Sequence, residues 1–245
     1  MAKTTEVLDF LNKFAPLESA QHWDNSGWQV NFGNPEVNKI MAALTVTEDV
    51  VQQAIDANCD FILSHHPVFF EPIKKIAEKH ILEAIKHRIQ IYSMHTNLDI
   101  ALGGTSDMLA QKLGFQSVQI YNDFVRTASY EDYVPLDGLI QKVKEQFALD
   151  SLKVINNNKV EKVKTVAFCA GSGGNFISAL KNSKIDLYVT GDVKYHDAIE
   201  AENLVVFDVG HFESEKYVAD IFKNVLRETG VEVVAAKEEN IWHIV

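Results

Sequence analysis

The chain has 245 residues, which is enough for one large domain or two modest ones that bury a core without disulfide bonds. Acidic residues outnumber basic ones by 34 to 23, and the formal net charge of -11 opposes non-specific binding to a phosphate backbone or an anionic membrane surface. We therefore expect neither a membrane nor nucleic acid among the partners of this protein.

Cysteine usage and the amino terminus both indicate a cytoplasmic protein. Cys59 and Cys169 lie in apolar stretches and lack the spacing of a disulfide framework or a zinc site, so we expect buried thiols. The amino terminus has no secretory signal pattern, and no apolar run approaches the roughly 18 residues that a membrane span needs.

The first part of the chain alternates helical and β-rich segments. Apolar residues at helical spacing follow Thr4, a candidate cap, and Pro16 stops that helix. The alternation predicts an α/β fold with a largely parallel sheet flanked by helices. The expected order is a helix over 4–14, a strand over 40–46, a helix over 48–57, a strand over 61–64, a helix over 76–87 and a strand over 89–94.

The second part repeats this order, so we expect two similar α/β halves, residues 1–125 and 126–245, that arose by internal duplication. A chance likeness between two α/β halves is the alternative, because the match rests on element order rather than on identity. After a polar and aromatic stretch, 123–137, the expected elements are a hairpin of 152–155 and 160–163, a strand over 163–169, a glycine turn at 171–174 into a helix, a strand over 186–190, a helix over 196–202, a strand over 204–209 and a helix from 211 to about 228.

Two adjacent histidines, His65 and His66, follow the strand over 61–64 at its carboxyl end, where α/β sheets bind ligands. Adjacent residues on an extended segment point in opposite directions, which favours two metal ions that each take one histidine. A polar strand end with surface histidines is the alternative interpretation.

The strand over 89–94 ends at a second polar cluster. Asp99 is the candidate bridge between two cations, because a shared carboxylate lowers their mutual repulsion. His95 and Asn97 are expected to orient ligands or to contact substrate. For His95, a helix cap or a packed side chain is the alternative.

The strand over 204–209 leads into a third cluster. If the segment after Gly210 is helical, His211 and Glu215 share one face and can chelate together. Glu213 then points to solvent or to another subunit, and Ser214 supports the ligands.

Further clusters carry weaker predictions. Asp192 and His196 can act as acid and base near pH 7, although His196 is equally a helix-start residue. The glycine turn at 171–174 is expected to be structural, with phosphate binding as the minority view. Residues 22–25 form a capped turn or a cavity wall.

Four motifs, in this order along nearly the whole chain, resemble the Nif3-like family, whose members are also named GTP cyclohydrolase 1 type 2 homologs: residues 23–27, 64–67, 95–99 and 210–215. The resemblance implies two divalent metal ions per chain, and a toroidal homohexamer with the ions facing an inner cavity. At 245 residues the chain resembles the short form without an inserted domain. The implied ligands are His65, His66, Asp99, His211 and Glu215.

The resemblance also implies a metal-dependent hydrolase that opens the ring of GTP towards 7,8-dihydroneopterin triphosphate. In such a reaction we expect His95 or His196 to transfer protons. Nitrogen and oxygen ligands suit Zn, Fe, Mn or Co and do not choose among them. The sequence shows no guanine pocket and only scattered lysines for a triphosphate, at 74, 75 and 194. The alternative is a metal-binding or scaffold hexamer without turnover, which assays on nucleotides and phosphoesters distinguish.

Overall fold

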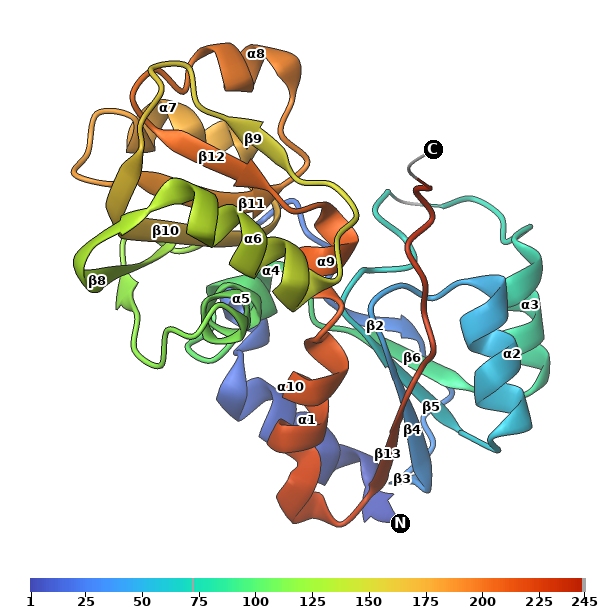
Figure 1. The fold of residues 1–245 in the computed structure, drawn as a ribbon. Helices are drawn as coiled ribbons and strands as arrows, with labels where there is room; N and C mark the ends of the chain where they lie inside the picture. Colours follow the sequence, from blue (N-terminus) through green and yellow to red (C-terminus); the bar gives the residue numbers. More distant parts are fainter. Residues whose placement is uncertain (72, 244–245) are drawn as a thin grey trace. The chain divides into compact units, whose positions relative to one another are not determined.

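The computed structural model describes residues 1–71 and 73–243, and its fold is α/β as predicted (Figure 1). The chain forms two compact units, each with its own main sheet. Unit 1 contains residues 1–104 and 216–239, and unit 2 contains residues 105–215 together with the segment that begins at Asn240.

Unit 1 is built on a five-stranded sheet with the strand order β13-β4-β5-β6-β2. The first four strands run parallel, and β2 is antiparallel to β6. Helices α2 and α3 pack on one face of the sheet, and α1 and α10 pack on the other (Figure 1). The bounds are β1 Ala2–Lys3, α1 Thr4–Phe14, η1 Leu17–Ser19, β2 Gly27–Val30, β3 Glu36–Val37, β4 Lys39–Ala43, α2 Glu48–Asp56, β5 Phe61–Ser64, α3 Lys79–Lys86, β6 Gln90–Ser93, α4 Thr96–Ile100, α10 Val218–Leu226, η3 Arg227–Thr229 and β13 Glu232–Ala235.

Local sequence explains the elements that lead to the first strand ends. Thr47 caps α2 by accepting a hydrogen bond from the backbone N–H of Val50 at 3.2 Å. Thr4, by contrast, donates its hydroxyl to the carbonyl of Asn34 and does not cap α1. All residues of β5 and β6 are buried, as expected for parallel strands covered on both faces. Because Ser64 pairs with Ser93, the carboxyl ends of these two strands meet at one edge.

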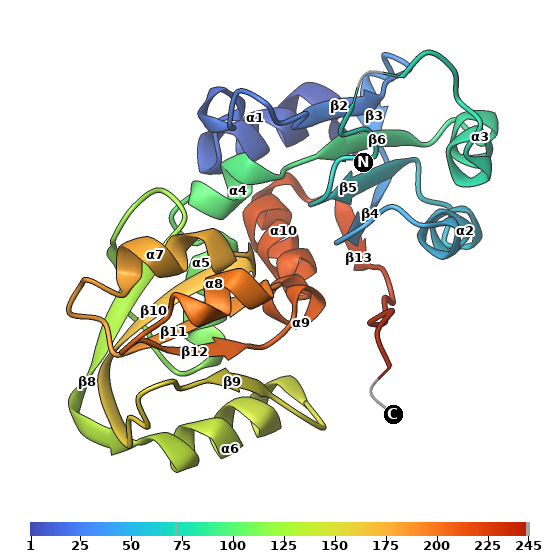
Figure 2. The same ribbon diagram turned by 90° about the horizontal axis from the view of Figure 1, so that it is seen from above.

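Unit 2 is built on a six-stranded sheet with the order β7-β8-β10-β11-β12-β9. Only the central strands β10, β11 and β12 are parallel, so this sheet is mixed rather than largely parallel (Figure 2). The polar stretch that received no predicted element contains the long strand β8. The bounds are α5 Thr105–Lys112, β7 Gln119–Ile120, β8 Arg126–Pro135, α6 Leu136–Phe147, β9 Lys153–Ile155, β10 Lys162–Ser172, η2 Gly174–Phe176, α7 Ile177–Leu180, β11 Leu187–Gly191, α8 Tyr195–Ile199, β12 Val205–Asp208 and α9 His211–Glu215.

The hairpin predicted for residues 152–155 and 160–163 is wrong. Strand β9 pairs with β12, where Val154 lies opposite Phe207, and it forms one edge of the sheet. Strand β10 is paired on one side by β8 and on the other by β11, so neither side is left for β9. The intervening loop is closed locally by Asn156, whose side chain exchanges two hydrogen bonds of 2.8 Å with the backbone of Val160.

Two helices are exchanged between the halves of the chain. Helix α5 follows α4 of unit 1 but packs against β10 in unit 2, and α10 follows α9 of unit 2 but packs against β4 and α1 in unit 1. The units therefore divide the chain after Gly104 and Glu215, whereas element order suggested a single boundary after residue 125. The helix expected from residue 211 to about 228 is accordingly interrupted between α9 and α10.

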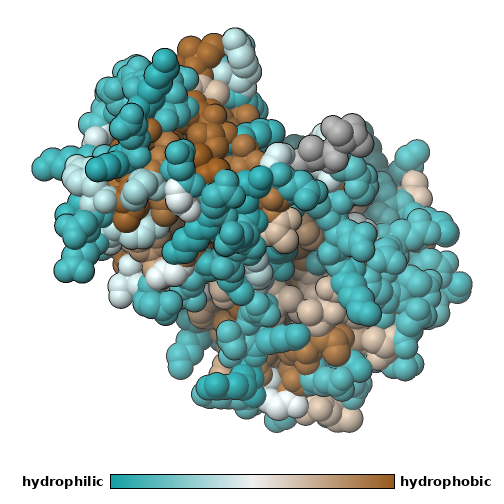
Figure 3. All heavy atoms as spheres, in the orientation of Figure 1, coloured by the Kyte–Doolittle hydropathy of each residue, from teal (hydrophilic) through white to brown (hydrophobic). Residues whose placement is uncertain are grey.

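The surface of unit 2 shows hydrophobic side chains on the face that carries β9 (Figure 3). A cavity of about 530 Å³ opens beside this strand, lined by Leu136, Ile140 and Val154 and by Lys159 and Lys162. None of the candidate metal ligands lines it. Within the described residues, no helix is long and apolar enough to cross a membrane.

Candidate metal-binding groups

The adjacent ends of β5 and β6 bring three histidines of unit 1 together. His65 and His66 directly follow β5, and His95 precedes α4 after the end of β6. One ring nitrogen from each of the three lies within 4.8 Å of the others. His95 is outside the predicted ligand set, but the structure groups it with the two predicted ligands His65 and His66.

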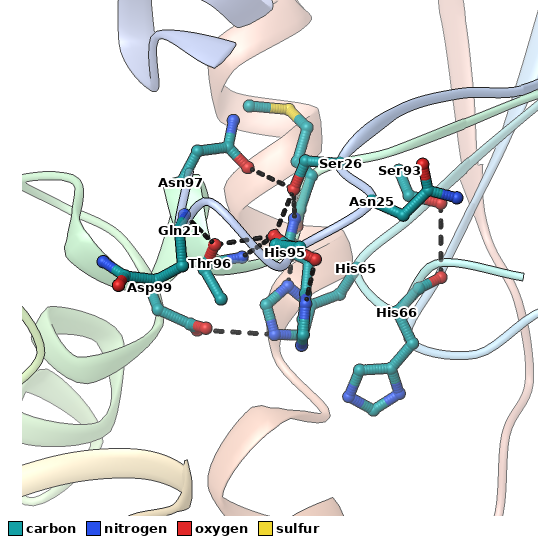
Figure 4. A network of polar contacts seen from close by, with 12 residues as sticks. Gln21, Asn25, Ser26, His65, His66, Ser93, His95, Thr96, Asn97 and Asp99 are labelled. Atoms are coloured by element: carbon teal, nitrogen blue, oxygen red, sulfur yellow. Dashed lines mark hydrogen bonds and ion pairs between the residues drawn. The ribbon is translucent and has the colours of Figure 1, made fainter. Parts of the chain in front are cut away.

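His65 is fully buried and its ring orientation is fixed. Its Nδ1 lies 2.7 Å from the carbonyl oxygen of Met94, which only accepts, so Nδ1 carries the proton and Nε2 the lone pair. That Nε2 atom faces the carboxylate of Asp99 on α4, with 3.4 Å to Oδ1 (Figure 4). Two electron-pair donors aimed at each other across a short distance are suited to share a cation.

His66 lies beside His65 rather than opposite to it. Their ring centroids are 5.1 Å apart, and the Nδ1 of His66 is 2.8 Å from the hydroxyl of Thr45. The expected opposite orientation does not hold because β5 ends at Ser64, so both histidines lie beyond the alternating strand. The sequence argument that neighbouring histidines require two separate ions therefore loses its geometric basis.

Asp24 orients His95 from the other side of the group. His95 Nδ1 donates to Asp24 Oδ1 at 2.8 Å, while the Thr96 backbone and the hydroxyls of Thr96 and Ser26 donate to Oδ2. Burial alone would raise the pKa of Asp24, but hydrogen bonds from His95, Thr96 and Ser26 outweigh it and hold that pKa well below 3.8. The ionised Asp24 thus leaves the Nε2 lone pair of His95 available.

Asn97 secures the turn that carries these side chains. It donates to the carbonyl of Ala15 at 2.9 Å. It also accepts from the hydroxyl of Ser26 at 3.1 Å (Figure 4). Its side chain is buried, so within this structure it supports the site rather than contacting a substrate.

Two exposed aromatic side chains border His95. The ring of Trp23 lies 6.1 Å and that of Phe70 lies 5.6 Å from the imidazole, both edge-to-face. Both are more than half exposed, which is unusual for such large apolar side chains. They form an aromatic border next to the histidine group.

Unit 2 holds a second group on α9. As predicted, this segment is helical and places His211 and Glu215 on one face, with 2.9 Å between Nε2 and Oε2. On its other nitrogen, His211 is 2.7 Å from the carboxylate of Asp192 at the end of β11. The hydrogen bond to Glu215 and, less strongly, Asp192 raise the pKa of His211 from 6.5 to about 9, against the opposing effect of burial.

The neighbours of this pair differ in part from expectation. Ser214 accepts from the backbone N–H of Gly171 at 2.9 Å and donates to the carbonyl of His211, so it ties α9 to β10 beside the candidate ligands. Glu213 is buried and accepts from Asn240 at 2.8 Å; the prediction that it faces solvent is wrong. His196 is exposed on α8 beside Tyr195, and no group of potential ligands among the described residues includes it.

The donor atoms of both groups fit a divalent transition metal. Imidazole nitrogens and carboxylate oxygens are common ligands of Zn, Fe, Mn and Co, and the ring orientation of His65 is fixed by a backbone carbonyl. Both cysteines are buried, as predicted. Asp24 and Asp192 were noted in the sequence only as cavity or acid–base residues, and pairing them with His95 and His211 required the fold.

Comparison with known proteins gives a consistent result. Residues 2–241 match the family model described as Duf34/NIF3 (NGG1p interacting factor 3). The chain is 31% identical over 253 residues to a GTP cyclohydrolase 1 type 2 homolog of Lactococcus lactis, with 96% of this chain and 97% of that protein covered. It is 32% identical to the GTP cyclohydrolase 1 type 2 of Helicobacter pylori, with 92% of each covered. A solved Bacillus cereus protein related to NIF3 matches with a TM-score of 0.90 at 22% identity, over 99% of both chains.

Proposed function

Because the chain belongs to the Duf34/NIF3 family, we propose that it is a divalent-metal hydrolase of the GTP cyclohydrolase 1 type 2 kind. The observation that carries the proposal is the group of His65, His66 and His95, whose ring nitrogens lie within 4.8 Å of one another. Such a concentration of imidazoles at the ends of two adjacent parallel strands is typical of a metal site.

Five residues are proposed as ligands of two ions per chain. Supporting observations are the buried Nε2 of His65 that faces Asp99, the position of His66 beside His65, and the short contact between His211 and Glu215. The ions are Zn, Fe, Mn or Co, since the donors suit all four. The proposed ligands are His65, His66, Asp99, His211 and Glu215.

The bound metal ions would supply Lewis-acid chemistry, which activates water and polarises the attacked carbon. His95 is proposed to accept and return a proton at Nε2, because Asp24 fixes the proton of Nδ1. His196 is proposed as the second proton-transfer residue, from its place in the sequence alone. If the His95→Ala and His196→Ala variants lose turnover but retain metal, these roles are supported. Normal turnover in both variants contradicts them.

Metal content tests the binding part of the proposal. Elemental analysis of protein purified without chelator should find about two ions per chain, and His65→Ala and Glu215→Ala should each lower this number sharply. His87→Ala is the matched control, because this histidine lies exposed at the end of α3 and belongs to neither group of potential ligands. Metal-free wild type that cannot be reloaded contradicts the proposal.

The aromatic border suggests the class of substrate. Trp23 and Phe70 expose flat apolar rings beside His95, which favours a planar heterocycle over an aliphatic substrate. The GTP cyclohydrolase names belong to the relatives; for this chain, ring opening of a purine nucleotide is the proposed reaction.

Replacing the aromatic side chains of the border should weaken substrate binding without changing metal binding. Trp23→Ala and Phe70→Ala are expected to raise the KM for GTP roughly 10-fold, the scale of one lost base-stacking contact, with metal content unchanged. Trp242→Ala replaces another exposed tryptophan, in the carboxyl-terminal segment, and should leave KM unchanged. Metal-loaded protein that turns over neither nucleotides nor phosphoesters favours the alternative of a metal-binding or scaffold protein.

A further inference from the structure

Gly171, at the carboxyl end of strand β10, lies directly against the carboxylate of Glu215. Its backbone has a φ of +67°, and its N–H donates to Ser214 at 2.9 Å. A Cβ added at this position would overlap Oε1 of Glu215 and would lie 3.1 Å from Cδ and 3.5 Å from Nε2 of His211. The space above Gly171 is therefore the space that the carboxylate occupies.

The two oxygens of Glu215 are thus held in different ways. Oε2 lies 2.9 Å from Nε2 of His211, while Oε1 occupies the place that a Cβ of residue 171 would take. The side chain is only 4% exposed, so it has little room to adopt another rotamer without losing His211. Any side chain at position 171 would push the carboxylate away from the histidine.

We propose that Gly171 is a positioning residue, whose missing side chain holds Glu215 beside His211 in the arrangement in which the pair binds a divalent metal ion. This inference rests on the proposed function and deepens it. It assigns a role to the glycine turn at 171–174 that is neither a simple turn nor a phosphate cradle.

The rival explanation is that position 171 needs glycine only for its backbone conformation. Gly230 allows the two explanations to be separated, because its φ is +69° and a Cβ added there meets nothing within 4 Å. Gly230→Ala thus places an alanine at nearly the same positive φ without displacing a candidate ligand. Gly191 would be a poor control, since a Cβ there would lie 2.8 Å from backbone atoms of Gly210 and His211 and would disrupt the fold.

The decisive measurement is Zn²⁺ affinity, by competition with a chromophoric chelator, for the full-length wild type, G171A, G230A, E215D and the double variant G171A/E215D. We expect G171A to bind roughly 10- to 100-fold more weakly, as for lost groups that orient metal ligands, and G230A to match wild type. In the E215D background, the shorter side chain clears the new methyl group. In that background, G171A should then lower the Zn²⁺ affinity roughly threefold at most. The effects of the two substitutions on affinity would therefore not be additive.

Three outcomes would each overturn the inference. G171A could bind Zn²⁺ as tightly as wild type, G230A could lose as much Zn²⁺ affinity as G171A, or G171A could lower the affinity by the same factor in the E215D background. Thermal unfolding of the metal-free proteins should show one cooperative transition for both G171A and G230A, which excludes general misfolding. A crystal structure of metal-free G171A should show the Glu215 carboxylate displaced from His211, and an unmoved carboxylate contradicts the inference. If wild type binds no Zn²⁺, the proposed function fails, and this crystal structure alone decides the role of Gly171.

Discussion

The imidazole of His211 lies between the carboxylates of Asp192 and Glu215, and this placement has a consequence for pH. In the metal-free protein, the hydrogen bond to Glu215 contributes most to raising the pKa of His211 from 6.5 to about 9. Because the folded-state pKa is the higher one, protonated His211 stabilises the metal-free fold fully below pH 6.5. That contribution is lost as the pH rises from 6.5 through about 9.

An NMR titration of the His211 ring proton in chelator-treated protein measures this directly. We expect a midpoint near 9 in wild type, a clearly lower midpoint in Glu215→Gln and a smaller decrease in Asp192→Asn, following the order of the two causes. A wild-type midpoint at or below 6.5 contradicts the assignment.

For single residues, the sequence predicts which side chains belong to the candidate site better than it predicts which side chains contact one another. The histidines and carboxylates at strand ends were identifiable, because parallel strands gather their carboxyl ends at one edge. The contact between Asp24 and His95 joins residues 71 positions apart, and no local pattern carries that information. The relative direction of His65 and His66 was also inaccessible, because both lie beyond the end of β5 and tertiary contacts with Met94 and Thr45 orient their rings.

Helix α10 follows unit 2 in the sequence but packs in unit 1, and we expect it to contribute strongly to the stability of unit 1. Its residues Val218, Ile221, Phe222 and Leu226 are buried in unit 1. Phe222→Ala should lower the free energy of unfolding by about 3–5 kcal/mol, the cost of a large cavity in a packed core.

Denaturant unfolding followed by tryptophan fluorescence can report this change, because Trp28 packs against Tyr92 within unit 1. Asn224→Ala, an exposed position of the same helix, is the control and should change stability by less than about 0.5 kcal/mol. A loss below about 1 kcal/mol for Phe222→Ala would show that α10 is not part of this core.

The elements predicted well are those whose signal is local. Strand β5 was placed at its observed bounds, because a short run of apolar residues ends abruptly at the polar histidines. Strand β8 was missed, because most of its residues are half-buried or exposed and its pairing partners decide its conformation. The hairpin error has the same origin: loop composition predicted a turn, and the sheet assigned other partners to both strands.

For the whole molecule, the family resemblance predicts a homohexamer. The exposed apolar side chains Ile120 on β7 and Tyr133 on β8 are the kind of surface that an assembly covers. Light scattering coupled to size exclusion should give about six times the chain mass of 27.5 kDa. A monomer across micromolar concentrations would contradict the prediction.

Sequence could not predict how the chain divides into units. Element order predicts two consecutive halves. Instead, α5 follows α4 of unit 1 but packs in unit 2, and α10 follows α9 of unit 2 but packs in unit 1. An exchange of this kind leaves the periodicity of both helices unchanged, so only tertiary contacts reveal it.

Because α10 and β13 belong to unit 1 but follow unit 2 in the sequence, the two units become complete at different times during protein synthesis. The ribosome produces unit 2, apart from its last segment, as one continuous stretch, so that unit can close early. The amino-terminal sheet has to wait, because strand β4 receives its neighbour β13 only when residues 232–235 have emerged. Until then, the edge of β4 remains open to mispairing with other nascent chains, although its residues were among the first to be made.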